Sequence, residues 1–358
     1  MKALRIYAGP AARRHIERNG LQPSDVRVIP AAAGGPKGLI LGSLDRFIFG
    51  EWLPQSSQPI DLIGASIGAW RMATACLDNP VEALQRLEHD YIHQDYEVPP
   101  GRKRPTAEHI SQRFGENLRA FYGGRVPEVL NHSRYRLHVV TSRGRHILSR
   151  EHPVLTPLGY AGAFLANSIR RKSLGAWLER VVFSARHAPL PFQSHDYPTR
   201  QVELTDGNFS QALQASCSIP FVLKAVQDIS GAPRGAYWDG GITDYHLHLD
   251  YRSEGQPGIV LYPHFQKEVI PGWLDKALQR RHGTTPFLDN VVVLAPDPEW
   301  VKSLPNGKLP DRTDFERYGS DVAKRIQTWN NAAASSHQLT EEFACWVMSS
   351  DPIALEAI

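Results

Sequence analysis

Residues 59–76 read PIDLIGASIGAWRMATAC, an apolar run followed by a Gly-x-Ser-x-Gly turn and a helix-length run. This order is typical of a buried strand that turns sharply into a helix and exposes a serine hydroxyl on a strained elbow. Gly64 and Gly68 leave room for so tight a turn. We therefore predict that Ser66 is a nucleophile and that the N–H of Ile67 faces a developing oxyanion. An ordinary strand-to-helix turn that contains serine is the alternative.

The rest of the chain alternates short apolar runs with helix-length amphipathic stretches, the pattern of an α/β sheet covered on both faces. The predicted strands are 26–30, 60–63, 137–141, 180–183, 236–238, 258–262 and 291–294. The predicted helices are 11–19, 37–49, 67–77, 81–91, 209–217, 314–330 and 337–348. We expect a main domain over 1–295, with its motifs in about 26–250, and a linker with a helical C-terminal extension over 296–358.

A second glycine cluster lies one strand-helix unit upstream of Ser66 and reads AAGGPKG over residues 32–38. Successive glycines before a helix leave backbone N–H groups free to bind an anion, and Lys37 adds a positive charge. A nucleotide-binding loop is a weaker interpretation, because the residues after Lys37 are Gly38 and Leu39 where a Walker loop needs Ser or Thr. We expect Gly34, Gly35, Lys37, Gly38 and Ile67 to form an oxyanion hole.

The nucleophile also needs a base, and GAYWDGG at residues 235–241 supplies a candidate. An apolar approach that ends in Asp-Gly-Gly suggests a carboxylate at the end of a strand, where Gly240 and Gly241 let the chain pass close to another loop. We predict that Asp239 is the base and that partial burial raises its pKa above the ordinary value of about 3.9. A simple Asp-Gly turn is the alternative.

Taken in chain order, these motifs resemble the signature of the patatin-like phospholipase family: a glycine-rich loop, Gly-x-Ser-x-Gly and Asp-Gly-Gly. The segment ASCSIPF at 215–221 is similar to a further family element, Ala-Ser-x-x-x-Pro. The resemblance implies a three-layer α/β/α sandwich with a mostly parallel central sheet. It also implies a calcium-independent lipid acyl hydrolase with a Ser66–Asp239 dyad, fatty-acyl esters of phospholipids, lysophospholipids or related lipids as substrates, and no cofactor.

Other interpretations of the same residues stay open. Acyl transfer to an alcohol would use the same dyad, and His246 would complete a Ser-His-Asp triad of the α/β-hydrolase type. A non-catalytic lipid- or partner-binding protein on the same scaffold is a further alternative. Polar and apolar residues alternate from Asp244 to Tyr251, which we interpret as a half-buried strand with a solvated polar face. A divalent-metal site on that face is the weaker interpretation, and we expect no metal.

The net charge of +3 hides an asymmetry, since residues 101–180 carry +10 and the remainder −7. The arginines are dispersed and lack a nucleic-acid recognition signature, so we expect no nucleic-acid partner. Within this basic insertion, apolar residues of 158–178 surround a cluster of cations, a combination suited to an anionic lipid surface. The candidate contacts are Arg170, Arg171, Lys172 and Trp177, and a packed helix with solvated arginines is the alternative.

Composition limits the remaining classes. The chain has 358 residues, of which 42% are hydrophobic and 22% charged, as expected for a globular protein. Three widely spaced cysteines form neither a disulfide framework nor a metal motif, which favours a reducing compartment. With no apolar run of membrane-spanning length, we expect a cytoplasmic protein that contacts membranes peripherally. The sequence does not indicate an oligomeric state.

Overall fold

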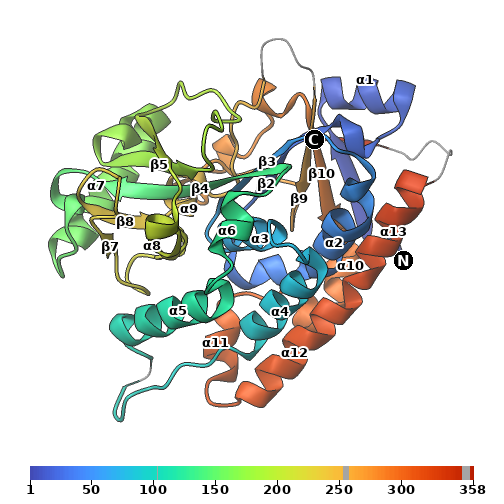
Figure 1. Cartoon of the computed structure of the whole chain (residues 1–358). Helices are drawn as coiled ribbons and strands as arrows, with labels where there is room; N and C mark the ends of the chain where they lie inside the picture. Colours follow the sequence, from blue (N-terminus) through green and yellow to red (C-terminus); the bar gives the residue numbers. More distant parts are fainter. Residues whose placement is uncertain (103, 253–257, 349–354) are drawn as a thin grey trace.

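The structure is a computed structural model that describes residues 1–102, 104–252, 258–348 and 355–358. Its centre is a mixed, mostly parallel sheet with the strand order β11-β1-β10-β9-β2-β3-β4-β5-β6, and β8 pairs with both β4 and β7 (Figure 1). The strands are β1 (Leu4–Ala8), β2 (Val26–Ala31), β3 (Ile60–Ala65), β4 (Tyr135–Gly144), β5 (Leu178–Ser184), β6 (Thr199–Glu203), β7 (Val226–Gln227), β8 (Ala236–Asp239), β9 (Ile259–Pro263), β10 (Val291–Pro296) and β11 (Glu356–Ala357).

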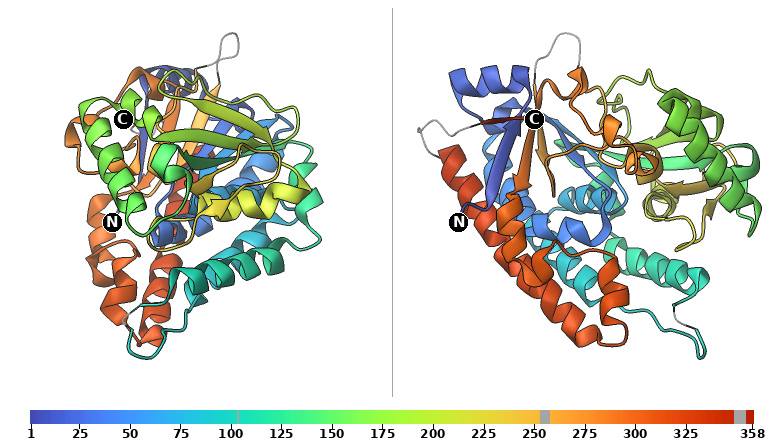
Figure 2. Two further views of the ribbon diagram at one scale, coloured as in Figure 1. Left: turned by 90° about the vertical axis from the view of Figure 1, so that its left-hand side faces the viewer. Right: turned by 180° about the vertical axis from the view of Figure 1, so that it is seen from behind.

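Helices lie on both sides of the sheet, so the chain folds as a three-layer α/β/α sandwich (Figures 1 and 2). They are α1 (Pro10–Asn19), α2 (Gly42–Phe47), α3 (Ile67–Ala75), α4 (Pro80–His93), α5 (Ala107–Tyr122), α6 (Val126–Leu130), α7 (Leu155–Ile169), α8 (Asp206–Ser216), α9 (Gly241–Asp244), α10 (Pro298–Ser303), α11 (Thr313–Tyr318), α12 (Val322–Ser335) and α13 (His337–Met348). Among the described residues no helix is long and apolar enough to cross a membrane.

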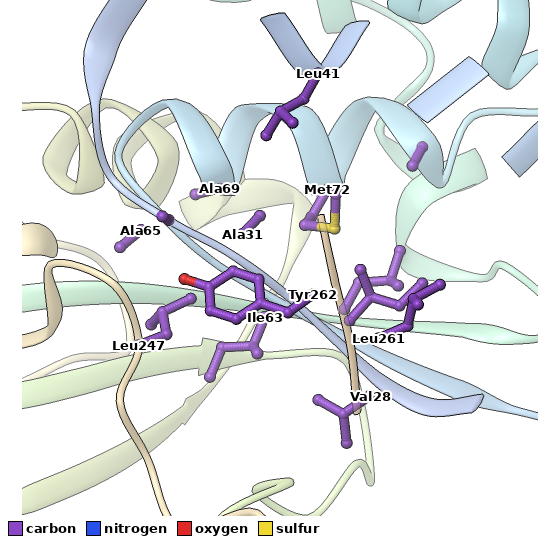
Figure 3. Close-up of a cluster of buried hydrophobic side chains, with 14 of the residues drawn as sticks. Val28, Ala31, Leu41, Ile63, Ala65, Ala69, Met72, Leu247, Leu261 and Tyr262 are labelled. Carbon is purple, nitrogen blue, oxygen red and sulfur yellow. The ribbon is translucent and has the colours of Figure 1, made fainter. Parts of the chain in front are cut away.

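The central strands are almost entirely buried because helices cover both faces of the sheet. Every residue of β3 and of β10 is buried. Figure 3 shows buried side chains on both faces of the sheet: Leu261 lies on the side of Ala69 and Met72 of α3, and Ile63 and Leu247 lie on the other side. This packing holds the carboxyl end of β3, and therefore the elbow at Ser66, against a rigid layer.

All seven predicted strands are present, each within three residues of its predicted ends. The exposed edge strand β6 was not predicted, because its sequence TRQVE has little apolar character. The continuous helix predicted over 37–49 is wrong, since a 3-10 helix (Gly35–Leu41) precedes α2 and a π-helix (Ile48–Trp52) follows it.

The half-buried strand predicted for Asp244 to Tyr251 is also wrong. Asp244 is the last residue of the short helix α9, a turn follows it, and both the polar and the apolar side chains of this stretch are buried. The polar groups have partners inside the protein: the Asp244 carboxylate pairs with Arg180, and the His248 ring bonds to Thr285. Alternation of polar and apolar residues therefore reflects internal hydrogen bonding here and not a solvated face.

The C-terminal segment packs on the rest of the chain. Helix α13 contacts α2 and β1, helix α12 contacts the 3-10 helix Gly35–Leu41, and β11 pairs in parallel with β1. A division of the chain near residue 295 stays a proposal about domain organisation. The packing places the residues before α11 at the edge of the candidate site described below.

Candidate active site

Ser66 lies at the tight turn between β3 and α3. Its backbone has φ 57° and ψ −129°, a conformation that is strained for a residue with a side chain. The two flanking glycines make the turn sterically feasible. A β-carbon at Gly64 would lie 2.4 Å from the Cα of Ala69, and one at Gly68 would lie 1.9 Å from the carbonyl oxygen of Ala31. Both positions therefore require glycine because neighbouring backbone occupies the space.

The hydroxyl of Ser66 faces Asp239, which stands at the end of β8. Ser66 Oγ donates a 2.7 Å hydrogen bond to Asp239 Oδ2, although the two residues are 173 positions apart. The other carboxylate oxygen, Oδ1, accepts a 2.7 Å bond from the N–H of Gly241. Both side chains are almost completely buried, with 4% and 5% of their surfaces exposed. The arrangement can pass the serine proton to the carboxylate without an intervening group.

The pKa of Asp239 is raised above its ordinary value, mainly because burial disfavours the charged carboxylate. The Ser66 hydroxyl, the charge of Arg312, the Gly241 N–H and the charge of Lys276 oppose this shift. Burial thus makes the carboxylate a better proton acceptor, and the opposing groups keep it from being protonated too readily.

Ser216, at the end of α8, connects the tight turn at Ser66 to the loop that follows Asp239. Its hydroxyl accepts a 2.9 Å bond from the N–H of Ser66 and donates a 2.7 Å bond to the carbonyl of Val140. Its carbonyl accepts a 3.1 Å bond from the N–H of Gly240. Sequence reasoning noted the segment 215–221 but not this role. In the sequence, Ser216 is marked only by its place ahead of Pro220, and this spacing does not reveal that its hydroxyl bonds to Ser66 and Val140.

The residues predicted for the oxyanion hole separate into two groups. Gly34 and Lys37 line one cavity with Ser66 and Asp239, and the N–H of Gly34 has no hydrogen-bond partner among the described residues. Gly38 and Ile67 line a second, smaller cavity. Gly35 has φ 58°, a conformation that favours glycine, and lies beside Arg312. As the first residue of α3, Ile67 has an N–H without an acceptor within the helix.

The cavity over Ser66 has a volume of about 200 Å³. Segments distant in sequence form its wall, including the turn after α8, the 3-10 helix Trp273–Asp275 and the residues just before α11. Its lining residues are Ala33, Gly34, Lys37, Ser66, Ile219, Pro220, Asp239, Gly241, Ile242, Tyr245, Trp273, Lys276, Asp311, Arg312 and Thr313. The sequence carries no local signal for Lys276 or Arg312, because neither belongs to a motif.

His246 is not connected to the serine and the aspartate. Its Nδ1 lies 3.0 Å from the carbonyl of Glu268 and 3.0 Å from the amide of Ile270, and its Nε2 has no partner among the described residues. Burial lowers the pKa of His246 well below its ordinary value. The direct bond from Ser66 to Asp239 leaves no imidazole between them, so this geometry is not that of a Ser-His-Asp triad. Across the described ranges, no three His, Cys, Asp or Glu side chains are grouped to hold a metal ion.

The four candidate lipid contacts do not share one surface. Arg170 and Lys172 are exposed, but the guanidinium of Arg171 pairs at 2.7 Å with the buried carboxylate of Asp275. The ring of Trp177 lies against Gly162 of α7, where a β-carbon would be 2.5 Å from it. Arg171 and Trp177 therefore hold α7 and the following turn on the protein. The +10 charge of the insertion overstates its free surface charge, because some of its arginines are neutralised internally.

Comparisons with known proteins bear on this site. A sequence model of the family described as patatin-like phospholipase matches residues 32–246, the stretch that contains Ser66 and Asp239. Among solved structures, the crystal structure of VipD from Legionella pneumophila matches with a TM-score of 0.33 and 13% sequence identity. That match covers 89% of this chain and 67% of that one. No curated protein matches this chain.

Proposed function

The chain belongs to the patatin-like phospholipase family, whose model matches more than half of its length, and we propose that it is a calcium-independent serine hydrolase of fatty-acyl esters. Its substrates are phospholipids, lysophospholipids or related lipids. Ser66 is the nucleophile and Asp239 the base. The observation that supports these roles most directly is the buried 2.7 Å hydrogen bond between Ser66 Oγ and Asp239 Oδ2.

In the proposed reaction, Ser66 Oγ attacks the ester carbonyl carbon while its proton moves to Asp239. The N–H groups of Gly34 and Ile67 and the charge of Lys37 stabilise the oxyanion. The C–O bond to the alcohol then breaks, and the alcohol leaves with the proton from Asp239. Water attacks the acyl-enzyme as Asp239 accepts one of its protons. The bond to Ser66 Oγ then breaks as this oxygen takes the proton back from Asp239, which releases the fatty acid and restores the dyad.

A fluorophosphonate probe tests this proposal without knowledge of the lipid. We expect covalent labelling of Ser66, located by peptide mass spectrometry, at an equal rate with EDTA or with calcium. Because Asp239 must be ionised to accept the proton, the labelling rate should fall as pH is lowered through a pKa above the ordinary value of about 3.9. Absence of labelling in folded protein would favour the non-catalytic lipid- or partner-binding alternative.

We also propose that α7 contacts an anionic lipid surface. Its outer face exposes Leu158, Leu165 and Ile169, with 58%, 63% and 85% of their surfaces accessible. Near it, Phe221 is 60% exposed, contacts Tyr160 of α7 edge to face, and directly follows Pro220 of the cavity wall. The cavity of about 200 Å³ is smaller than a typical ligand pocket, so part of a lipid would extend onto this face.

Replacing Leu158 and Leu165 together with asparagine should weaken binding to vesicles of equimolar phosphatidylglycerol and phosphatidylcholine by about tenfold. Neutralising Arg170 and Lys172 with glutamine should weaken it by about fivefold for each charge at low salt. Sedimentation with the vesicles measures both effects. The matched control is Met348→Asn, an exposed apolar side chain on α13. Equal binding by all variants would exclude α7 as the contact.

The cellular location is part of the same proposal. Cys76, Cys217 and Cys345 are all free thiols. Free thiols agree with a reducing compartment, and we propose a cytoplasmic protein that binds the membrane surface peripherally and reversibly.

A further inference from the structure

Three cationic side chains converge on the cavity over Ser66. Lys37, Lys276 and Arg312 all line it, and none of them has a carboxylate oxygen within 4.0 Å among the described residues. Two carboxylates also line the cavity, Asp239 and Asp311. Asp311 pairs at 2.8 Å with Lys308, which pairs at the same distance with the buried carboxylate of Asp314. The lining thus carries three positive and two negative groups, and its cations outnumber its carboxylates when all are charged.

The surroundings of Lys276 disfavour its protonated form. Its ammonium lies 3.9 Å from the centroid of the Tyr245 ring, and partial burial together with Lys37 and Arg312 lowers its pKa to about 8. Like charges around a desolvated ammonium disfavour its charged form. A bound anion would relieve this repulsion and make Lys276 fully charged.

The segments that carry Lys276 and Arg312 are fixed in place. Lys276 follows a 3-10 helix whose last residue, Asp275, is fully buried and pairs at 2.7 Å with both Arg171 and Arg281. Arg312 precedes α11, and a β-carbon at Gly35 would lie 3.3 Å from its Nε, so its guanidinium lies against the glycine-rich loop. Both cations lie beyond residues 32–246, the part that matches the family.

We propose that Lys276 and Arg312 recognise a dianionic phosphate monoester on the substrate, next to the scissile acyl ester. This inference rests on the proposed function and assigns a specificity to the same site. A phosphate monoester carries about −1.5 to −2 charge at neutral pH, and the three cations that line the cavity have no carboxylate of their own within 4.0 Å among the described residues to compete with it. A guanidinium binds phosphate oxygens in pairs, and an ammonium binds them as a point charge. A phosphocholine headgroup suits the cavity less well, because its choline would place a further cation beside the three that line it.

Matched esters with the same acyl chain test the specificity. We expect fatty acid to be released from 1-acylglycerol 3-phosphate with a kcat/KM at least about tenfold above those for the lysophosphatidylcholine and the monoacylglycerol. Soluble 1-butyrylglycerol 3-phosphate and monobutyrin form a second pair. A preference in both pairs means that the site recognises the phosphate group itself. If only the long-chain pair shows the preference, the preference comes from electrostatic attraction of the protein to a charged lipid surface, and the proposal is overturned.

Single substitutions test which side chains cause the preference for phosphate esters. Lys276→Gln and Arg312→Gln should each lower the ratio of kcat/KM for the phosphate ester to kcat/KM for the matched neutral ester by about tenfold. The ratio is the measure because both charges also act on the pKa of Asp239, and a change at Asp239 affects the two esters alike. Lys276→Arg should retain the preference. The matched control, Lys302→Gln, removes an exposed cation from α10 and should behave as wild type. Melting temperatures close to wild type check that the variants are folded. An unchanged preference in both glutamine variants would overturn the proposal.

Binding of glycerol 3-phosphate to Ser66→Ala protein, measured by calorimetry, separates the two proposals. We expect binding that Lys276→Gln and Arg312→Gln each weaken by about tenfold. If no ester is cleaved but this pattern holds, the hydrolase proposal fails and the phosphate site stands. If esters are cleaved without preference for phosphate and glycerol 3-phosphate does not bind, the phosphate site is rejected and the hydrolase proposal stands.

Discussion

Ser66→Ala should lower fatty-acid release by at least about 10⁴-fold, because it removes the atom that forms the acyl-enzyme. Asp239→Asn should lower kcat by about 10²–10⁴-fold, because the amide cannot accept the serine proton. The measurement is the release of fatty acid from mixed phospholipids, with products identified by mass spectrometry. Ser335→Ala is the matched control: within the described part of the chain its hydroxyl bonds only to a carbonyl of its own helix, and it lies on the exposed face of α12.

Two results would contradict these roles. If Ser66→Ala keeps a tenth or more of the wild-type rate, Ser66 is not the nucleophile. If Asp239→Asn retains the wild-type rate, another group takes the proton. Product analysis also distinguishes the acyltransferase alternative, because transfer of the acyl chain to an added alcohol would yield a new ester in place of free fatty acid. Circular dichroism and melting temperature establish that each variant is folded.

Arg180→Met should lower the free energy of unfolding by about 3–5 kcal/mol. The Arg180 guanidinium is fully buried and bonds to both oxygens of Asp244, at 2.7 and 2.6 Å. Asp244 is also buried, so the substitution leaves a carboxylate with much of its compensation removed. Asp244 ends α9, the turn that starts with Gly241 of the Asp-Gly-Gly motif. Activity should therefore fall along with stability.

Urea denaturation followed by circular dichroism measures this effect. The double variant Arg180→Met, Asp244→Leu should recover much of the loss, because it removes both buried charges together. Arg86→Met is the matched control. It breaks an exposed helical pair with Asp90 at 3.4 Å and should cost less than about 1 kcal/mol. A loss no larger than that control would show that the buried pair contributes little.

Much of the fold and part of the candidate site were predictable because their requirements are local. The apolar runs of the seven predicted strands mark segments buried on both faces. Gly64 and Gly68 are glycines because adjacent backbone lies within 2.4 and 1.9 Å of where a β-carbon would be. Such close approaches recur wherever this turn forms, so residue type and spacing reveal them. The helix predicted over 37–49 and the strand predicted over 244–251 failed where tertiary contacts overrode the local pattern.

The order of the motifs in the sequence was enough to indicate a three-layer α/β/α sandwich, through their resemblance to the patatin-like family, and to select Ser66 and Asp239 as candidates. Their 2.7 Å contact, the Ser216 bridge, the inward pairing of Arg171 and the convergence of Lys276 and Arg312 on the cavity appear only in the folded chain. The physical reason is the range of the interactions. A tight turn depends on adjacent residues, whereas a charged cavity depends on segments up to hundreds of positions apart, whose juxtaposition leaves no periodicity or spacing in the sequence.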